Sequence, residues 1–353
     1  MKVEILKRTK TYISIDIEAA LIRGKQYIIE IGAVKWKPDN TTETFTQLIQ
    51  PYRFTKLNNR IQQLTGITTE QLLDAPSFKK AIQQFKRWCG DDYILLTFGE
   101  FDRKVLEEEL ARNYVKQNFL YPMIDFQQKY MIHHGIKEQP SLGGLMEQLG
   151  LEVETQHRAL ADADSLLRIF QTVNGEEMIE QQKTNAFSLL LGSLKQHEKT
   201  FSLIITTLNA HVDDTKIEID SIVSHVNELP YTYETVTKTL PTGEEEESQV
   251  IRIQASELTK QFIEHYFISL KDEVLITRSG LKGLNRILRL HNCIAPKIEV
   301  MTLTNILNNE ELSEQFRYDG EAADVYERKV RKLIKQYKQA IIGEFKKRAL
   351  IDA

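Results

Sequence analysis

The chain has 353 residues, of which 41% are hydrophobic and 27% are charged, with 16 glycines and 8 prolines. This composition excludes disordered, collagen-like and disulfide-scaffold proteins and is typical of a globular chain with about two domains. Lysine and arginine number 46 against 50 aspartates and glutamates, for a net charge of −4. The charge excludes a whole-chain basic signature of nucleic-acid binding, so any basic surface must be local.

The two cysteines, Cys89 and Cys293, lie far apart in the sequence. This argues against a disulfide framework or a thiolate zinc site and favours a reducing compartment. The sequence shows neither a secretory leader pattern nor a run of about 18 apolar residues. We therefore expect a cytoplasmic protein that does not engage a membrane.

In the first half of the chain, the spacing of apolar residues changes from one typical of strands to one typical of helices. Three strands separated by short turns are predicted first, which favours a hairpin meander, and helices then alternate with strands. The strands are expected at residues 12–17, 27–36, 44–49, 93–98 and 122–126, and the helices at 69–73, 77–88, 101–114, 141–149 and 159–170. This order predicts an α/β fold, a mixed sheet with helices on its faces.

A polar, helix-prone segment at residues 174–185 separates the two halves. We place a boundary there, with domains at residues 1–180 and 187–353. The second domain is predicted to be α+β, from strand-like residues 201–208, a hairpin of 231–239 with 249–255, and a final helix from about 321 to 350. Its hairpin tip, residues 241–247, is read as a solvated loop, with an acidic docking segment as the alternative. The sequence assigns no role to residues 187–353, and self-association or binding of another protein is one possibility for them.

Two carboxylates project side by side from the first predicted strand. The alternation of residues places Ile13, Ile15 and Ile17 on one face and Asp16 and Glu18 on the other. Like charges two residues apart repel each other, and a divalent cation would remove that penalty. Mg²⁺ and Mn²⁺ take hard oxygen ligands, and a pair of such ions can stabilise a phosphoryl displacement. An acidic strand end at the surface is the alternative reading.

Three further polar residues stand near predicted strand and helix ends. Asp102 lies in the first turn of the helix at 101–114, where a helix cap is the alternative role. His157 and Asp162 can both face the sheet only if His157 lies on the loop that enters the helix at 159–170. An imidazole there suits a base near neutral pH, and a structural histidine is the alternative.

In this order the motifs resemble those of the DEDDh 3′-to-5′ exonucleases, also called DnaQ-like or ribonuclease-T-like exonucleases. The family's Asp-x-Glu stands here as Asp16-Ile17-Glu18, its second aspartate as Asp102, and its His-x-Ala-x-x-Asp as residues 157–162. Residues 64–68, Leu-Thr-Gly-Ile-Thr, are also family-like. The Glu-Ala pair at 18–19 and the Thr-x-Gly-x-x-Asp at 97–102 resemble the KapD-like and Eri-type subgroup. The resemblance covers roughly residues 8–175, and residues 187–353 resemble no family that we recognise.

The resemblance implies a ribonuclease-H-like fold, with a mixed five-stranded sheet flanked by helices. It also implies metal-dependent release of nucleoside monophosphates from the 3′ end of single-stranded RNA or DNA. Asp16, Glu18 and Asp162 would bind one Mg²⁺ or Mn²⁺ ion, and Asp16 would bridge to a second ion held by Asp102 largely through water. His157 would deprotonate the attacking water.

The resemblance further implies substrate contacts from six residues. These are the backbone of Ala19 and Ala20, the side chains of Leu64 and Ile67 as a wedge against the terminal base, and Phe98 and Phe101 as stacking surface. Ala20 departs from the threonine common in the family, and core filling is the alternative for the two phenylalanines. The alternative function is a non-catalytic nucleic-acid-binding or regulatory protein that uses the exonuclease fold as an interaction platform.

Outside the motifs, Arg278, Lys282, Arg286 and Arg289 recur at helical spacing. A helix would align them in a basic stripe able to grip phosphates, and a solvated helix face is the alternative. The pair at residues 133–134, His-His, lacks a metal-ligand partner at suitable spacing and is expected to end a helix.

Overall fold

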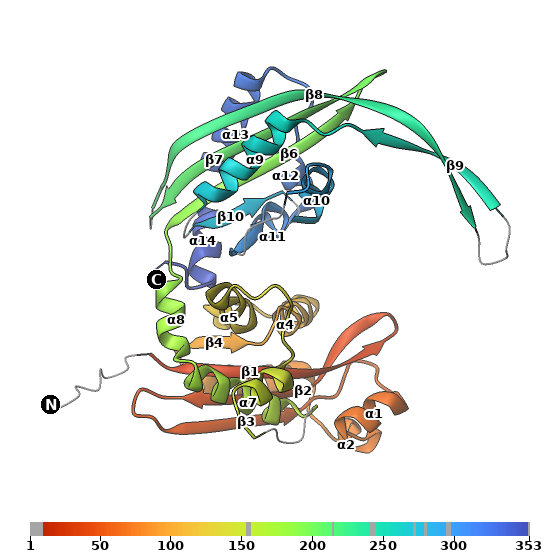
Figure 1. Ribbon diagram of the computed structural model, residues 1–353. Coiled ribbons are helices and arrows are strands. Elements are labelled where there is room, and N and C mark those ends of the chain that lie inside the picture. The colour runs from red at the N-terminus through yellow and green to blue at the C-terminus, as the bar shows by residue number, and fades with distance from the viewer. Residues whose placement is uncertain are drawn as a thin grey trace. The chain divides into compact units, whose positions relative to one another are not determined.

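The computed structural model describes residues 10–152, 157–213, 215–239, 245–270, 273–278, 281–293 and 298–351, with the backbone alone at 238 and 281–285. Two compact units are present, residues 1–183 with 346–353 and residues 184–345 (Figure 1). Residues 346–353, assigned to the second domain from the sequence, therefore belong to the first unit. Within the described ranges, no helix is long and apolar enough to cross a bilayer.

The first unit is built on a five-stranded sheet of order β3-β2-β1-β4-β5. The strands are β1 (Tyr12–Ile22), β2 (Lys25–Trp36), β3 (Thr42–Leu48), β4 (Ile94–Thr97) and β5 (Met123–Asp125). The first three form an antiparallel meander, whereas β4 and β5 run parallel to β1. The sequence predicted a ribonuclease-H-like fold with a mixed five-stranded sheet flanked by helices. The structure confirms this prediction (Figure 1).

Helices cover both faces of this sheet. They are α1 (Asn59–Thr65), α2 (Thr69–Leu73), α3 (Phe78–Cys89), α4 (Phe101–Arg112), α5 (Phe126–His134), α6 (Leu142–Gln148), α7 (Ala159–Thr172) and α8 (Gly175–Gln181), with a 3₁₀ turn, η1, at Asn118–Leu120. Helix α5 ends at the histidine pair, as predicted, because Gly135 adopts a left-handed conformation there with φ 62°. The structure adds α1, η1 and the range of α5 to the predicted elements, and α8 lies in the segment 174–185 that was expected to be helix-prone.

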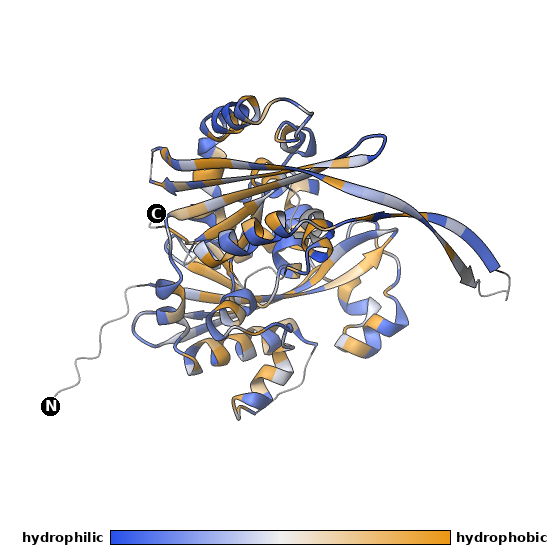
Figure 2. Ribbon diagram, turned by 45° about the horizontal axis from the view of Figure 1, so that its top comes forward, coloured by the Kyte–Doolittle hydropathy of each residue, from blue (hydrophilic) through white to orange (hydrophobic). Residues whose placement is uncertain are grey.

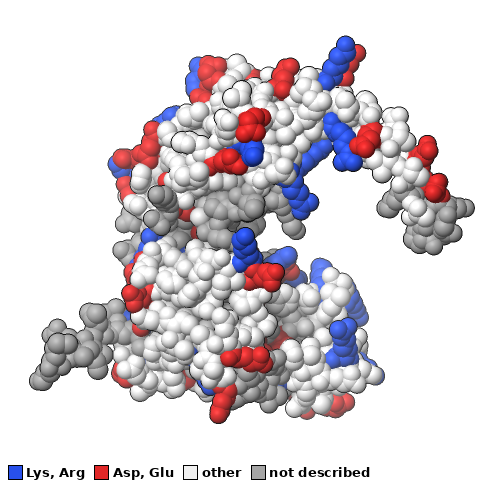
Figure 3. Space-filling model, viewed as in Figure 1, with Lys and Arg blue, Asp and Glu red and all other residues white. Residues whose placement is uncertain are grey.

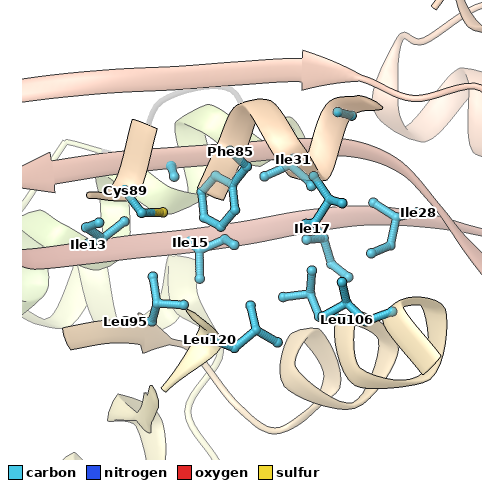
Figure 4. Close-up of a cluster of buried hydrophobic side chains, with 14 of the residues drawn as sticks. Ile13, Ile15, Ile17, Ile28, Ile31, Phe85, Cys89, Leu95, Leu106 and Leu120 are labelled. Carbon is cyan, nitrogen blue, oxygen red and sulfur yellow. The ribbon is translucent and has the colours of Figure 1, made fainter. Parts of the chain in front are cut away.

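Two apolar layers hold the helices against the sheet. On one face Ile13, Ile15 and Ile17 of β1 point toward Phe85 of α3 and Leu106 of α4 (Figure 4). On the other face a separate apolar cluster lies under α5, α6, α7 and α8. Ala349, near the end of the chain, also belongs to this cluster. Because the isoleucines take the first face, the intervening residues of β1 point toward α7, as the alternation predicts.

The second unit contains a six-stranded sheet of order β11-β10-β6-β7-β8-β9. Its elements are β6 (Ala186–Gln196), β7 (Thr200–Val212), β8 (Ile217–Thr239), β9 (Glu245–Ile253), α9 (Glu257–Ser269), β10 (Val274–Thr277), α10 (Leu281–Leu290), β11 (Val300–Thr302), α11 (Leu303–Leu307), α12 (Glu310–Glu314), α13 (Ala323–Gln336) and α14 (Lys338–Lys347), which ends in the first unit. The α+β class is as predicted.

The far part of β8 pairs only with β9 among the described strands and forms a two-stranded ribbon. Tyr231 faces Ile253 in this ribbon, so the predicted hairpin is present, and its second strand begins four residues and ends two residues earlier than expected. The ribbon is hydrophilic toward its end (Figure 2) and carries side chains of both signs (Figure 3). Arg252 and Glu234 form an ion pair in it. Residues 240–244 of the tip lie outside the described part.

Two predictions for this unit are wrong. The final helix is not continuous, because the backbone leaves helical geometry at Tyr337, with φ −97° and ψ 16°, between α13 and α14. The basic stripe does not lie on one helix either, because α10 begins at Leu281 and Arg278 precedes it. Arg286 and Arg289 are exposed on α10, and the side chain of Lys282 lies outside the described part.

Candidate active site

Three carboxylates converge where α7 crosses β1. Oxygen atoms of Asp16, Glu18 and Asp162 lie within 4.8 Å of one another. The two strand residues share a face because they are two positions apart, and Asp162 lies in the first turn of α7, which packs on β1 and β2. The register shifts between Glu18 and Ala19, so a β-bulge bends the strand just beyond the acids. The structure thus brings together three of the four predicted metal ligands within one site.

The first turn of α7 lies unusually close to β2. A Cβ atom built on Gly32 would lie 2.1 Å from the carbonyl carbon of Ala159 and 2.1 Å from the backbone nitrogen of Leu160. Gly32 is also the β2 partner of Asp16 in the sheet register. Because Gly32 has no side chain, α7, which carries Asp162, packs closely against β2 beside Asp16.

Glu30 of β2 anchors the same helix end. Its side chain is 1% exposed, and its Oε1 accepts a hydrogen bond of 2.7 Å from Arg158 Nη2. Its Oε2 accepts hydrogen bonds from Arg158 Nε at 3.1 Å and from the backbone N–H of Ala159 at 3.2 Å. Glu30 thus acts as a helix cap supplied by another element. Sequence reasoning missed it, although a glutamate inside the apolar run Ile-Ile-Glu-Ile was a visible signal.

His157 lies on the loop that enters α7, as the prediction required. Its backbone has a left-handed φ of 65°, and its N–H donates a 3.2 Å hydrogen bond to Oδ2 of Asp162. The imidazole is exposed beside the carboxylates. Together with the neighbouring Glu30–Arg158 contact, this bond fixes the backbone from which the candidate base projects.

Asp102 lies in the first turn of α4 and is 6% exposed, beside rather than within the group of three. The preceding turn is held by a hydrogen bond from Thr97 Oγ1 to the Gly99 carbonyl and by one of 2.9 Å from the Gly99 N–H to Asp125 Oδ1. Gly99 has φ 99°, which a residue with a side chain rarely adopts. Asp125, at the carboxyl end of β5, is an additional acid that sequence reasoning missed.

Burial and mutual repulsion raise the pKa values of these acids. Burial, and then the charges of Asp102, Asp162 and Glu18, raise the pKa of Asp16 well above its ordinary value. Burial first, and then Asp162, raise the pKa of Glu18 to about 7. Burial and the charge of Asp125 raise the pKa of Asp102 to about 8, against a hydrogen bond from the backbone of Ile17. The pKa of Asp162 is also raised by burial.

These properties fit a divalent-cation site. Buried like charges repel one another, and a bound cation relieves that repulsion. The donors are hard carboxylate oxygens, which suit Mg²⁺ and Mn²⁺ rather than softer metals. Carboxyl groups with raised pKa values beside the exposed imidazole of His157 are also the arrangement expected of acid–base and metal-assisted chemistry.

The six predicted substrate contacts differ in accessibility. Ala20 and Ile67 are 2% and 1% exposed and belong to one apolar cluster, so their side chains fill the core. Leu64 on α1 is 48% exposed and Phe101 on α4 is 52% exposed, so both can meet a ligand. Ala19 is half-buried, and Phe98 is half-buried against the α7 side of the core.

A family model described as an exonuclease of the ribonuclease T type matches residues 13–170. The DNA polymerase III subunit epsilon of Aquifex aeolicus is 30% identical over 162 residues, 45% of this chain and 78% of the relative. The probable 3′-5′ exonuclease KapD of Bacillus subtilis is 28% identical, over 48% of this chain and 87% of the relative. The PolC-type DNA polymerase III of Bacillus subtilis is 31% identical over 174 residues, 45% of this chain but only 11% of the polymerase.

Among solved structures, the nuclease domain of 3′hExo, a DEDDh family member bound to rAMP, matches with a TM-score of 0.44. Its sequence identity is 24%, and the match covers 48% of this chain and 92% of that one. Both this match and the sequence relatives fall on about half of the chain or less.

Proposed function

This chain belongs to the DEDDh family of 3′-to-5′ exonucleases, and from that premise we propose that it removes nucleoside monophosphates from the 3′ end of single-stranded nucleic acid. The convergence of Asp16, Glu18 and Asp162 beside His157 carries the proposal. Asp16, Glu18 and Asp162 would hold one Mg²⁺ or Mn²⁺ ion, and Asp16 with Asp102 a second. Divalent ions held by these residues would supply positive charge to the attacking and leaving oxygens.

The chain's own groups supply the proton transfer and the positioning. The His157 imidazole accepts a proton from the water that attacks the terminal phosphorus. The new P–O bond forms as the P–O3′ bond breaks, which releases a nucleoside 5′-monophosphate and leaves a shortened strand with a 3′ hydroxyl. Exposed Leu64 is available to wedge against the terminal base, and exposed Phe101 is available to stack on a base, a contact that tolerates any base. We place the reaction in the cytoplasm, because both cysteines are free thiols.

The test is stepwise shortening of oligonucleotides labelled at the 5′ end, with matched RNA and DNA strands side by side. We expect stepwise shortening with Mg²⁺ or Mn²⁺ and none in EDTA. Asp16→Asn should lower the rate at least about a hundredfold, because it removes a charged carboxylate ligand shared by the two proposed metal ions. Asp91→Asn is the matched control, since Asp91 is exposed and precedes the amino end of β4. Tight binding of strands without shortening, unchanged by Asp16→Asn, would instead favour the non-catalytic platform.

A further inference from the structure

A polar cavity lies wholly within the second unit, outside the carboxyl end of β10. Strand β10 ends at Thr277 beside Leu190 of the parallel strand β6, and β6 continues to Gln196, so residues 190–194 form one wall. The cavity volume is about 340 Å³, within the range of roughly 300–1,000 Å³ found for small-molecule sites. The crevice outside the carboxyl ends of parallel strands is where open α/β sheets bind ligands.

Positive charge exceeds negative charge in this cavity. Three arginines, Arg278, Arg286 and Arg317, line it together with one carboxylate, Glu314. Glu314 forms an ion pair with Arg278 and lies 3.8 Å from Arg317. Arg286 forms no hydrogen bond or ion pair within the described part of the chain, and its guanidinium lies 6.0 Å from the ring centre of Phe201. An anionic group would therefore find at least one guanidinium free to bind it.

A buried hydroxyl in the cavity wall also lacks a partner. Thr277 is 1% exposed, and its Oγ1 has no hydrogen-bonding partner among the described residues. Buried hydroxyls are normally paired, because leaving one unpaired costs free energy. A threonine hydroxyl can donate to a phosphate oxygen. Thr277 thus points to a ligand independently of the arginines beside it.

An aromatic surface completes the site. Tyr318 is half-buried at the cavity, and its ring packs edge-on against Tyr326 with 5.2 Å between ring centres. The hydroxyl of Tyr326 donates to the carbonyl of Phe316, which fixes the supporting ring. A partly exposed ring on a fixed support is a stacking surface for a nucleobase.

We propose that this cavity binds a nucleotide, with its phosphate held by Arg286 and Thr277 and its base stacked on Tyr318. The common chemistry is a nucleotide phosphate, either on a free nucleoside monophosphate or within a nucleic-acid strand. Because the site belongs to the second unit and contains none of the acids of the candidate active site, the proposal does not depend on exonuclease activity.

The test is isothermal titration of the full chain in EDTA, so that the active-site acids have no cation to recruit a phosphate. The probes are thymidine 5′-monophosphate, thymidine, and a single strand of six thymidine nucleotides. We expect a phosphate probe to bind and thymidine not to bind. Arg286→Gln should weaken binding about tenfold or more. Arg289→Gln, an exposed arginine of the same helix that does not line the cavity, should leave the affinity unchanged.

Thr277→Val provides a second variant that preserves side-chain volume. It should leave the melting temperature of the ligand-free protein unchanged or higher, because an unpaired hydroxyl is removed, and it should weaken phosphate binding. Binding of the strand but not of the monophosphate would assign the site to nucleic acid and still support the proposal. Equal affinity for thymidine and its monophosphate, equal affinity in Arg286→Gln and Arg289→Gln, or no binding of either phosphate probe at millimolar concentration would overturn it.

Discussion

At the scale of single residues, Glu30 links the sheet to the loop that carries the candidate base. Its two carboxylate oxygens accept hydrogen bonds from the Arg158 guanidinium and from the backbone N–H of Ala159. His157 directly precedes Arg158 in the chain. The imidazole must lie within hydrogen-bond reach of the attacking water, and small displacements in such geometry cost much of the rate. Glu30 and Arg158 are therefore positioning residues.

Arg158→Ala should lower kcat by about tenfold or more while changing KM little, because the base is displaced but the exposed substrate surface remains. Stability should fall by about 1–3 kcal/mol, since the buried Glu30 charge loses its partner. Arg158→Lys should recover stability better than kcat, because an ammonium restores charge but not the two-pronged contact. Steady-state kinetics and chemical denaturation measure the two effects.

Arg328→Ala is the matched control, because it removes an arginine from an ion pair with Asp324 in which both side chains are 73% exposed. Such a surface pair contributes little to stability. Unchanged kcat in Arg158→Ala, with only stability lost, would show that the Glu30 contact is purely structural.

The raised pKa values predict a specific pH dependence for the metal-free protein. The pKa of Glu18 is about 7 in the folded chain, raised by burial from an ordinary value of 4.5. The folded state therefore binds more protons than the unfolded state between those two values, and stability falls as the pH rises through that interval. Glu18→Gln should stabilise the protein at about pH 8 in EDTA and have little effect at about pH 4.

Thermal unfolding of wild type and Glu18→Gln across this range measures the difference. Mg²⁺ should raise the wild-type midpoint more at about pH 8 than at about pH 5, because the cation competes with the same protons. Glu245→Gln, at an exposed acid of β9, is the control and should show neither trend. A stabilising effect of Glu18→Gln that grows on acidification would contradict the prediction.

At the scale of elements, the approach of α7 to β2 sets the positions of two candidate catalytic groups, Asp162 and His157, together. Gly32→Ala would place a methyl group 2.1 Å from helix backbone atoms, which cannot be accommodated without moving α7. We expect a loss of about 1–3 kcal/mol in stability and a loss of activity of about tenfold or more, since Asp162 and His157 shift with the helix.

Gly343→Ala is the control, because a Cβ there meets nothing within 4 Å and alanine favours the helical backbone of α14. Denaturation and exonuclease assays of both variants decide the matter. Full activity in a folded Gly32→Ala protein would show that the helix position tolerates displacement.

The same elements show what the sequence could predict. Alternation along residues 12–18 placed Asp16 and Glu18 on one face, and the distance between His157 and Asp162 required a loop before α7, both of which the structure shows. Glu30 was not predicted, because its role depends on a partner 128 residues away. The break at Tyr337 was not predicted because no glycine or proline marks it and the apolar spacing continues across it.

At the scale of the whole molecule, the second unit is inserted into the first, since residues 346–353 return to the first unit after residue 345. Ala349 belongs to the apolar cluster beneath α7, and the Lys347 ammonium lies 4.8 Å from the ring centre of Tyr121. Arg348 lies 3.9 Å from Glu100, the N-cap residue of α4. The last residues therefore contribute contacts to the unit that carries the candidate active-site acids, although residues 184–345 between the two parts form the second unit.

Removal of residues 346–353 should consequently destabilise the first unit. Two compact units can unfold in separate transitions, and Mg²⁺ should raise the transition of the first unit, because Asp16, Glu18 and Asp162 belong to it. The truncation should lower this metal-dependent midpoint by an amount corresponding to about 2 kcal/mol or more, since buried apolar contacts and an ion pair are lost. Differential scanning calorimetry with and without Mg²⁺ measures it, and removal of residues 352–353 alone is the control. An unchanged metal-dependent midpoint would mean that the C-terminal residues contribute nothing to the stability of the first unit.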